Sequence, residues 1–129
     1  MSAKVFGGAV AVFLALTGVA SAHHSGAMYD PQTKTSLQGT IEAFQWANPH
    51  AWVQLDVTDP ATRRTVKWVF EGLGTNQLTR AGWHRDSLKP GDVAVIAFNP
   101  LKDGQPGGRL ISATVDGKII GAQQPGEQP

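Results

Sequence analysis

The stretch TSLQGTIEAFQWA, residues 35–47, decides the fold. Polar and apolar side chains alternate through Leu37 and Ile41, and the alternation then slips by one residue so that Phe44 and Trp46 take the apolar positions. An alternation of period two predicts a β-strand. A slip of parity together with an internal glycine predicts that this strand is bent by a bulge. We therefore expect a long, coiled strand that contributes to both sides of a small barrel.

Further strands and one short helix follow this strand along the chain. The break NPH at residues 48–50 separates it from the second strand, so that the two form a hairpin. The second strand alternates cleanly, and polar turns separate the later ones. The expected elements are strands at residues 51–57, 65–71, 93–98 and 109–115, a short helix within residues 74–82, and room for a last short strand at residues 118–120.

This order of elements favours an all-β fold with one short helix, namely a small five-stranded, OB-like Greek-key barrel. A different small barrel, or an open five-stranded sheet with one helix, is the alternative. The same pattern of residues predicts the burial, the mobility and the helix capping of individual segments. These are an inward-facing Val66, a buried strand at residues 93–98, a mobile loop at residues 99–108, a helix cap at Thr75 or Asn76, and Gly82 just beyond the helix end.

The first 22 residues have the features of a secretory signal peptide. Lys4 supplies a positive charge, residues 5–19 are apolar, and Ala20-Ser21-Ala22 is a small-residue cleavage site. The apolar run is shorter than the ~20 residues of a spanning helix, and an uncleaved anchor is the alternative. We expect a periplasmic or secreted protein with a signal peptide at residues 1–22, an irregular segment at 23–34, a barrel domain at 35–120 and a disordered tail at 121–129.

The composition of the mature chain excludes several classes of partner and of metal site. Removal of 22 residues from 129 leaves 107, and the loss of Lys4 from 11 basic residues leaves ten to balance ten acidic ones. A neutral domain lacks the basic surface that nucleic acids or anionic membranes require. The chain has no cysteine, which excludes disulfides, iron–sulfur clusters and thiolate metal ligands. We expect no nucleic-acid partner, and no membrane span once the signal is cleaved.

Cleavage after Ala22 would make His23 the first residue, with a free α-amine. The amine, with an ordinary pKa of about 7.7–8.0, and the imidazole of one residue can chelate a transition metal. His50, held stiffly after Pro49, could supply a third nitrogen. Because nitrogen ligands in a near-planar set favour Cu(II), the sequence predicts a copper site of the histidine-brace type.

Other residues could assist this site or replace it. His24 allows a planar chelate made from the amine, its own amide and its own imidazole, and Glu71 could act as a ligand or accept a hydrogen bond from a histidine N–H. Met28 could add a thioether. The plainer alternatives are a solvated N-terminus, a His50 that only bonds a turn carbonyl, and a Glu71 that pairs with an arginine. His84, among charged residues, is expected on the solvated surface.

The tryptophans indicate a possible ligand face. Trp46 and Trp52 flank the turn that contains Asn48, and Trp52 has outward parity, as aromatic side chains on the binding faces of OB folds do. Packing of the four tryptophans in the core is the favoured alternative. No general acid–base pair, activated nucleophile or glycine-rich phosphate loop is evident in the sequence, so a non-enzymatic role is favoured.

Six motifs run in order through the expected domain: AHHS at residues 22–25, LQGTI at 37–41, WANPHAW at 46–52, WVFE at 68–71, LTRAGW at 78–83 and LKPGDV at 88–93. In these motifs the chain resembles a family of small exported bacterial proteins known as domain of unknown function 6152. The resemblance implies a periplasmic or secreted single domain and supplies no activity. It gives weight to the polar residues inside the motifs, which are His23, His24, Asn48, His50 and Glu71.

The sequence therefore leads to two hypotheses of different classes. The first is an exported copper-binding β-barrel protein that serves in metal carriage or buffering. The alternative is a metal-free periplasmic binding or accessory module that takes a small molecule, a glycan or a protein partner through its aromatic face.

Overall fold

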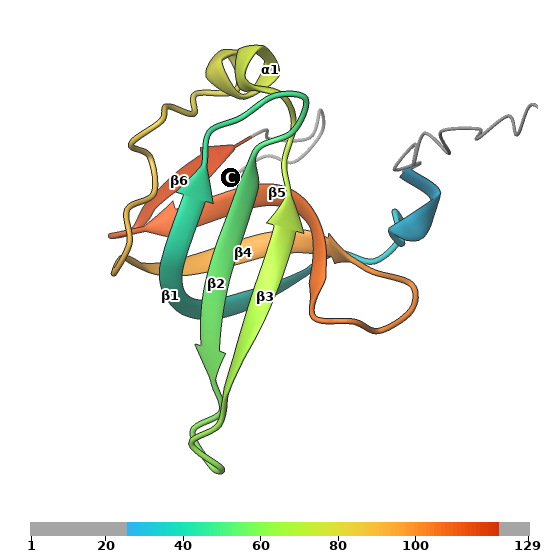
Figure 1. Ribbon diagram of the computed structural model, residues 1–129, viewed down its shortest axis with the longest axis vertical. Helices are drawn as coiled ribbons and strands as arrows, with labels where there is room; N and C mark the ends of the chain where they lie inside the picture. Colours follow the sequence, from blue (N-terminus) through green and yellow to red (C-terminus); the bar gives the residue numbers. More distant parts are fainter. Residues whose placement is uncertain (1–25, 122–129) are drawn as a thin grey trace, which may run out of the picture.

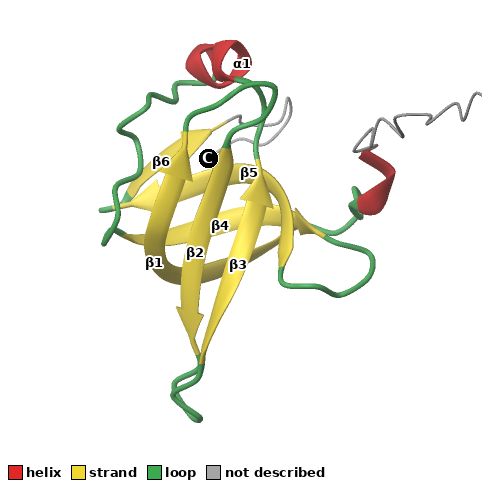
Figure 2. Ribbon diagram, in the orientation of Figure 1, coloured by secondary structure: helices red, strands yellow, loops and turns green. Residues whose placement is uncertain are grey.

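The computed structural model describes residues 26–121 (Figure 1). The predicted signal peptide, His23, His24 and all of the tail predicted at residues 121–129 except Gly121 lie outside the described residues. Gly121 itself is the last residue of a strand. Strands dominate the described part, with one short α-helix and one 3-10 turn (Figure 2). The elements are η1 (Gly26–Met28), β1 (Thr35–Gln45), β2 (Trp52–Thr58), β3 (Thr65–Glu71), α1 (Thr75–Arg80), β4 (Val93–Pro100), β5 (Gly107–Val115) and β6 (Lys118–Gly121).

The first five strands form a closed barrel, which confirms the expected all-β, OB-like architecture. The strands lie in the order β3-β2-β1-β4-β5-β6, and all these neighbours are antiparallel. A short parallel pairing of β3 with β5 closes the barrel, and it joins Val69 to Gly107 at one end and Glu71 to Arg109 at the other. We call this pairing the seam. The last strand, β6, pairs with β5 outside the closed barrel.

β1 bends as its sequence predicts. Its register against β2 shifts between Ile41 and Ala43, which is the expected bulge. The earlier part of the strand pairs with β4 and the later part with β2, so the strand belongs to both sides of the barrel. Gly39 is required in this strand, because a Cβ atom there would lie 2.5 Å from the carbonyl oxygen of Asp56.

Apolar side chains from every barrel strand fill the interior. Phe70 of β3 and Phe98 of β4 meet across the barrel with ring centroids 4.8 Å apart, a tilted arrangement that aromatic pairs favour. α1 lies over one end of the barrel, opposite the turn between β2 and β3 (Figure 1). The largest fully buried side chains are those of Ile41, Val53, Leu55, Phe70, Trp83, Ile96 and Phe98, of which Trp83 follows α1.

Four local expectations were wrong or incomplete. β4 is not buried on both faces: its outer side chains Val93 and Val95 are exposed, because one face of a barrel wall meets solvent. Val66 is 46% exposed because it lies near the open end of β3. The expected loop at residues 99–108 is shorter, since both its ends belong to strands β4 and β5.

The helix cap also differs from the prediction. Gly74 is the N-cap residue of α1, and the backbone N–H of Thr75 donates to the side-chain oxygen of Asn48 at 2.9 Å. Asn48 comes from the β1–β2 connection, so a residue distant in sequence performs the capping that was assigned to a local side chain. Gly82 has a φ of 87° just beyond the helix, as expected.

Candidate functional site

Glu71 is the one charged side chain that is buried within residues 26–121, with 5% of its surface exposed. It is the last residue of β3 and lies at the end of the seam, opposite Arg109. In the alternation of β3 it falls on the same face as Lys67 and Val69, the outer one, which would predict a solvated carboxylate. A segment outside the barrel covers it instead, and a buried carboxylate needs hydrogen-bond partners to remain stable.

Tyr29 provides that cover. Its hydroxyl donates a hydrogen bond to Oε2 of Glu71. Backbone bonds hold the segment in place, since the N–H of Asp30 donates to the carbonyl of Pro100 at 2.9 Å and the N–H of Lys102 donates to that of Met28 at 3.0 Å. Burial raises the pKa of the Tyr29 phenol well above its ordinary value, and the hydrogen bond and charge of Glu71 raise it further. Tyr29 is therefore a neutral hydrogen-bond donor.

His50 lies at the corner between β1 and β2, just after the cis peptide bond Asn48–Pro49. Its Nδ1 lies 3.1 Å from the carbonyl oxygen of Gly72 and 3.4 Å from Oε1 of Glu71. A carbonyl can only accept, so Nδ1 carries a proton and donates to it. In the neutral imidazole the other ring nitrogen, Nε2, then has the free lone pair, the arrangement that metal-binding histidines use.

Arg109 completes the group. We call Tyr29, His50, Glu71 and Arg109 the polar cluster. Its members line a small cavity of about 90 Å³, together with Gly26, Gly72 and Leu73. A Cβ atom on Gly26 would lie 3.5 Å from a guanidinium nitrogen of Arg109, so the first described residue reaches this cavity. The cavity is large enough for a few water molecules at ~30 Å³ each.

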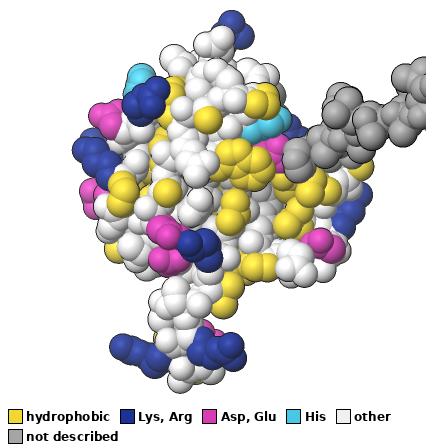
Figure 3. Space-filling view, viewed as in Figure 1, with side chains coloured by type: hydrophobic (Ala, Val, Ile, Leu, Met, Phe, Trp, Pro, Cys, Tyr) yellow, Lys and Arg dark blue, Asp and Glu magenta, His cyan; other side chains and the backbone are white. Residues whose placement is uncertain are grey.

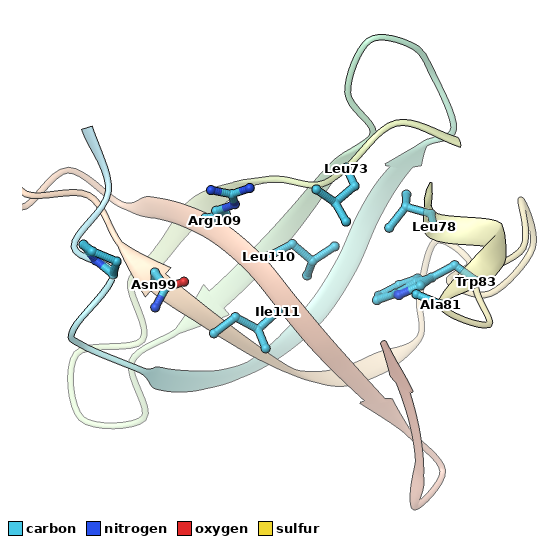
Figure 4. Close-up of a pocket in the computed structure, with 9 residues that line it drawn as sticks. Leu73, Leu78, Ala81, Trp83, Asn99, Arg109, Leu110 and Ile111 are labelled. Carbon is cyan, nitrogen blue, oxygen red and sulfur yellow. The ribbon is translucent and has the colours of Figure 1, made fainter. Parts of the chain in front are cut away.

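A second, larger cavity of about 430 Å³ adjoins the polar cluster (Figure 4). It opens where β5 continues beyond the seam and the chain after β3 turns toward α1. Arg109 and Leu73 line both cavities. The remaining lining residues are Pro31, Leu78, Ala81, Trp83, Asn99, Leu110 and Ile111.

The structure brings only part of the predicted site together. His50 and Glu71 meet, as described above. Trp46 packs against the core with its ring edge-on to Phe44, at 5.8 Å between ring centroids. The amide of Asn48 is engaged with Thr75, so its contacts serve the helix. Trp52 is half-buried and lies beside Glu71 in the β2–β3 pairing.

The remaining sequence candidates lie elsewhere. His84 is exposed, and its backbone N–H donates to the hydroxyl of Ser87 at 2.8 Å. Met28 is 39% exposed. His23 and His24 fall outside the described residues. Between residues 26 and 121 there is no group of three or more histidine, aspartate or glutamate side chains that could hold a metal by itself.

Tyr29 and Arg109 are the members of the polar cluster that sequence reasoning missed. Tyr29 was placed in an irregular lead-in, and Arg109 was only the first residue of a strand. A signal did exist for Tyr29, because it is the one tyrosine of the chain and lies among small and polar residues. For Arg109 no local signal exists, since its neighbours in the cluster come from β1–β2, β3 and the N-terminal segment.

The surface around the barrel carries both signs of charge. Figure 3 shows acidic and basic side chains interspersed on this face, with basic ones at the tip of the β2–β3 turn. Lys67 and Glu42 form an ion pair at 2.6 Å across this surface. No helix in the described part of the chain is long and apolar enough to cross a bilayer.

Comparison with known proteins agrees with the motifs. No curated protein and no solved structure matches the chain. The profile of a family of unknown function, DUF6152, matches residues 11–110, which include β1 to β4, α1, and both Glu71 and Arg109. That match covers more than half of the 129 residues. The chain therefore belongs to the family of unknown function DUF6152.

Proposed function

We propose that this protein is an exported copper-binding protein that carries or buffers the metal. His23, as the first residue of the mature chain, would bind Cu(II) through its amine and imidazole, and His50 would complete the set through Nε2. The observation that carries the proposal is the position of His50, whose Nδ1 is held by the carbonyl of Gly72 at 3.1 Å. This bond leaves Nε2 for a ligand.

The reach of the N-terminal segment supports the same site. Gly26 lies against Arg109 in the wall of the cavity that His50 also lines. His23 precedes Gly26 by three positions, and three residues of extended chain span at most ~10 Å. The amine and imidazole of His23 can therefore reach the neighbourhood of His50.

Glu71 has a supporting role in this proposal. Its two oxygens face Tyr29 and His50, so it orients the imidazole from behind instead of binding the metal. Arg109 opposes the binding of a cation at this cavity, and the carboxylate of Glu71 offsets that charge. His24 remains as an auxiliary ligand, or as the centre of the amine–amide–imidazole chelate.

The test is a copper titration of the mature protein that begins at His23, against the same protein with one alanine added before it. The added residue removes the amine–imidazole chelate, and we expect copper affinity to fall by more than about tenfold. His50→Ala should weaken binding by about 10–100-fold, whereas the matched control His84→Ala should leave it unchanged. Electron paramagnetic resonance should count the nitrogen ligands.

Two results would contradict the brace. Equal affinity with and without the added alanine would remove the N-terminal chelate from the site. If His50→Ala kept full copper affinity while the added alanine reduced it, His50 would not be a ligand, and His23 and His24 alone would bind the metal. Mass spectrometry of the exported protein must first show that residue 23 is the N-terminus.

A further inference from the structure

The larger cavity exists because the seam is short. β3 and β5 pair only from Val69 to Glu71, and beyond that point β5 and the chain after β3 separate. Leu73 on one side and Leu110 on the other line the gap, and Leu78 and Trp83 approach from α1 and the residues after it (Figure 4). The resulting volume, about 430 Å³, lies in the range of ~300–1,000 Å³ that small-molecule sites occupy.

The walls of this cavity are mainly apolar. Leu78 and Trp83 belong to the core, and Leu73, Ala81 and Leu110 pack against it. These side chains come from α1, from the connections on either side of it and from β5, so they are held by the barrel and not by a free loop. A ligand in this cavity would therefore place an apolar chain against a preformed surface.

Two polar side chains mark one end of the cavity. The side-chain amide of Asn99 is neutral, and one of its N–H groups donates to the carbonyl of Thr33 at 2.7 Å. Arg109 is exposed, and no hydrogen bond or ion pair joins its guanidinium to another residue between 26 and 121. Its neighbour across the seam, Glu71, is directed to Tyr29 and His50. Arg109 is therefore the cationic group in the lining of this cavity that can bind an anion.

We propose that this cavity binds a small amphipathic carboxylate, a monocarboxylic acid with an unbranched apolar chain. The carboxylate pairs with the guanidinium of Arg109, which can donate two parallel hydrogen bonds to it. The chain lies between Leu73, Leu110 and Trp83. This site is separate from the copper site, although Arg109 borders both cavities.

Octanoate and octanol are the probes, and the protein is studied with a chelator present so that no metal can bind the carboxylate. Calorimetry measures affinity, and tryptophan fluorescence reports on Trp83. We expect octanoate to bind at least about tenfold more tightly than octanol, because a hydrogen bond to a charged group contributes that much. No binding of octanoate, or equal binding of the two probes, would overturn the proposal.

Variants locate the site. Arg109→Gln should weaken octanoate binding about tenfold and leave octanol binding nearly unchanged, and the control Arg64→Gln, on the β2–β3 turn, should change neither. Ala81→Phe, which fills part of the cavity, should weaken both probes and tests the site even if Arg109→Gln does not fold. Unchanged octanoate binding in folded Arg109→Gln or in Ala81→Phe would overturn the assignment.

The two proposals fail separately. Removal of the Arg109 charge should weaken octanoate but strengthen copper binding, since a nearby cation is lost. His50→Ala should weaken copper binding and leave octanoate binding unchanged. Loss of octanoate binding in His50→Ala would show that the carboxylate is bound in the smaller cavity, and would overturn the second site.

Discussion

The barrel interior and the polar cluster at the end of the seam are built in opposite ways. The interior is apolar and closely packed, with Phe70, Ile96 and Phe98 almost fully buried. One residue after Phe70 along β3, Glu71 is almost as enclosed but carries a carboxyl group, which accepts a hydrogen bond from Tyr29 and lies 3.4 Å from Nδ1 of His50. A buried charge that has to be satisfied by distant residues costs stability that an apolar residue would not. The two regions therefore differ in what holds them together, which is apolar packing in the interior and specific polar contacts between distant segments at the seam end.

Truncation in the interior should have the largest effect on stability. Phe70→Ala removes a ring that packs against both Trp68 and Phe98. We expect a loss of about 3–5 kcal/mol in the free energy of unfolding, measured by urea denaturation. The variant should lose stability whether or not copper is present. A loss below about 1 kcal/mol would mean that the interior is not the main source of stability.

Substitution of Glu71 distinguishes charge from hydrogen bonding at the cluster. Glu71→Ala leaves the hydroxyl of Tyr29 without its acceptor and removes the carboxyl group that lies 3.4 Å from Nδ1 of His50, and we expect a loss of about 2–3 kcal/mol in the free energy of unfolding. Glu71→Gln keeps an acceptor for Tyr29 and should lose less. Urea denaturation of the two variants provides the comparison. If alanine were tolerated as well as glutamine, the hydrogen bonds at Glu71 would not contribute to stability.

Tyr29→Phe should have a smaller effect, because it removes only the hydroxyl. We expect a loss of about 1–2 kcal/mol near neutral pH. Burial, followed by the hydrogen bond to Glu71, raises the pKa of the Tyr29 phenol well above its ordinary value. Because the phenol has a higher pKa in the folded protein than in the unfolded chain, its contribution to stability is complete below about pH 10. That contribution is lost as the pH rises through the raised value.

Thermal unfolding as a function of pH checks this direction. Wild type should lose stability in alkali, and Tyr29→Phe, which lacks the one tyrosine of the chain, should lose less over the same range. The lysines, which also titrate in alkali, are the same in both proteins, so the difference between the two profiles reports on Tyr29 alone. Parallel alkaline profiles for the two proteins would contradict the burial of this phenol.

The smallest effect is expected at Asp30, which orders the turn that leads into β1. The hydroxyl of Thr33, and then the backbone N–H of Gln32, donate to this carboxylate and lower its pKa. A lowered pKa means that the contribution is present above about pH 3.9 and is lost as the pH falls through the lowered value. Asp30→Asn should therefore melt slightly below wild type at neutral pH, and the difference should vanish in strong acid. A difference that grew in acid would reverse the assignment.

Most of the barrel could be predicted from the sequence. The predicted bounds of the third strand, residues 65–71, match those of β3, and the parity slip in residues 35–47 marks the bulge of β1. These patterns are local, because a strand alternates its side chains between two faces whatever it later pairs with. The site was predicted less well: His50 and Glu71 were identified, whereas Tyr29 and Arg109 were not.

The sequence by itself determined the order of the strands along the chain, the bend in the first strand, the position of the short helix and the family to which the chain belongs. Only the tertiary structure decided which polar residues meet. Tyr29 and Glu71 are 42 positions apart, and Arg109 joins them through a parallel pairing of three residue pairs. The physical reason is that period and parity specify which way a side chain faces locally, whereas its burial and its partners depend on segments that are distant along the chain.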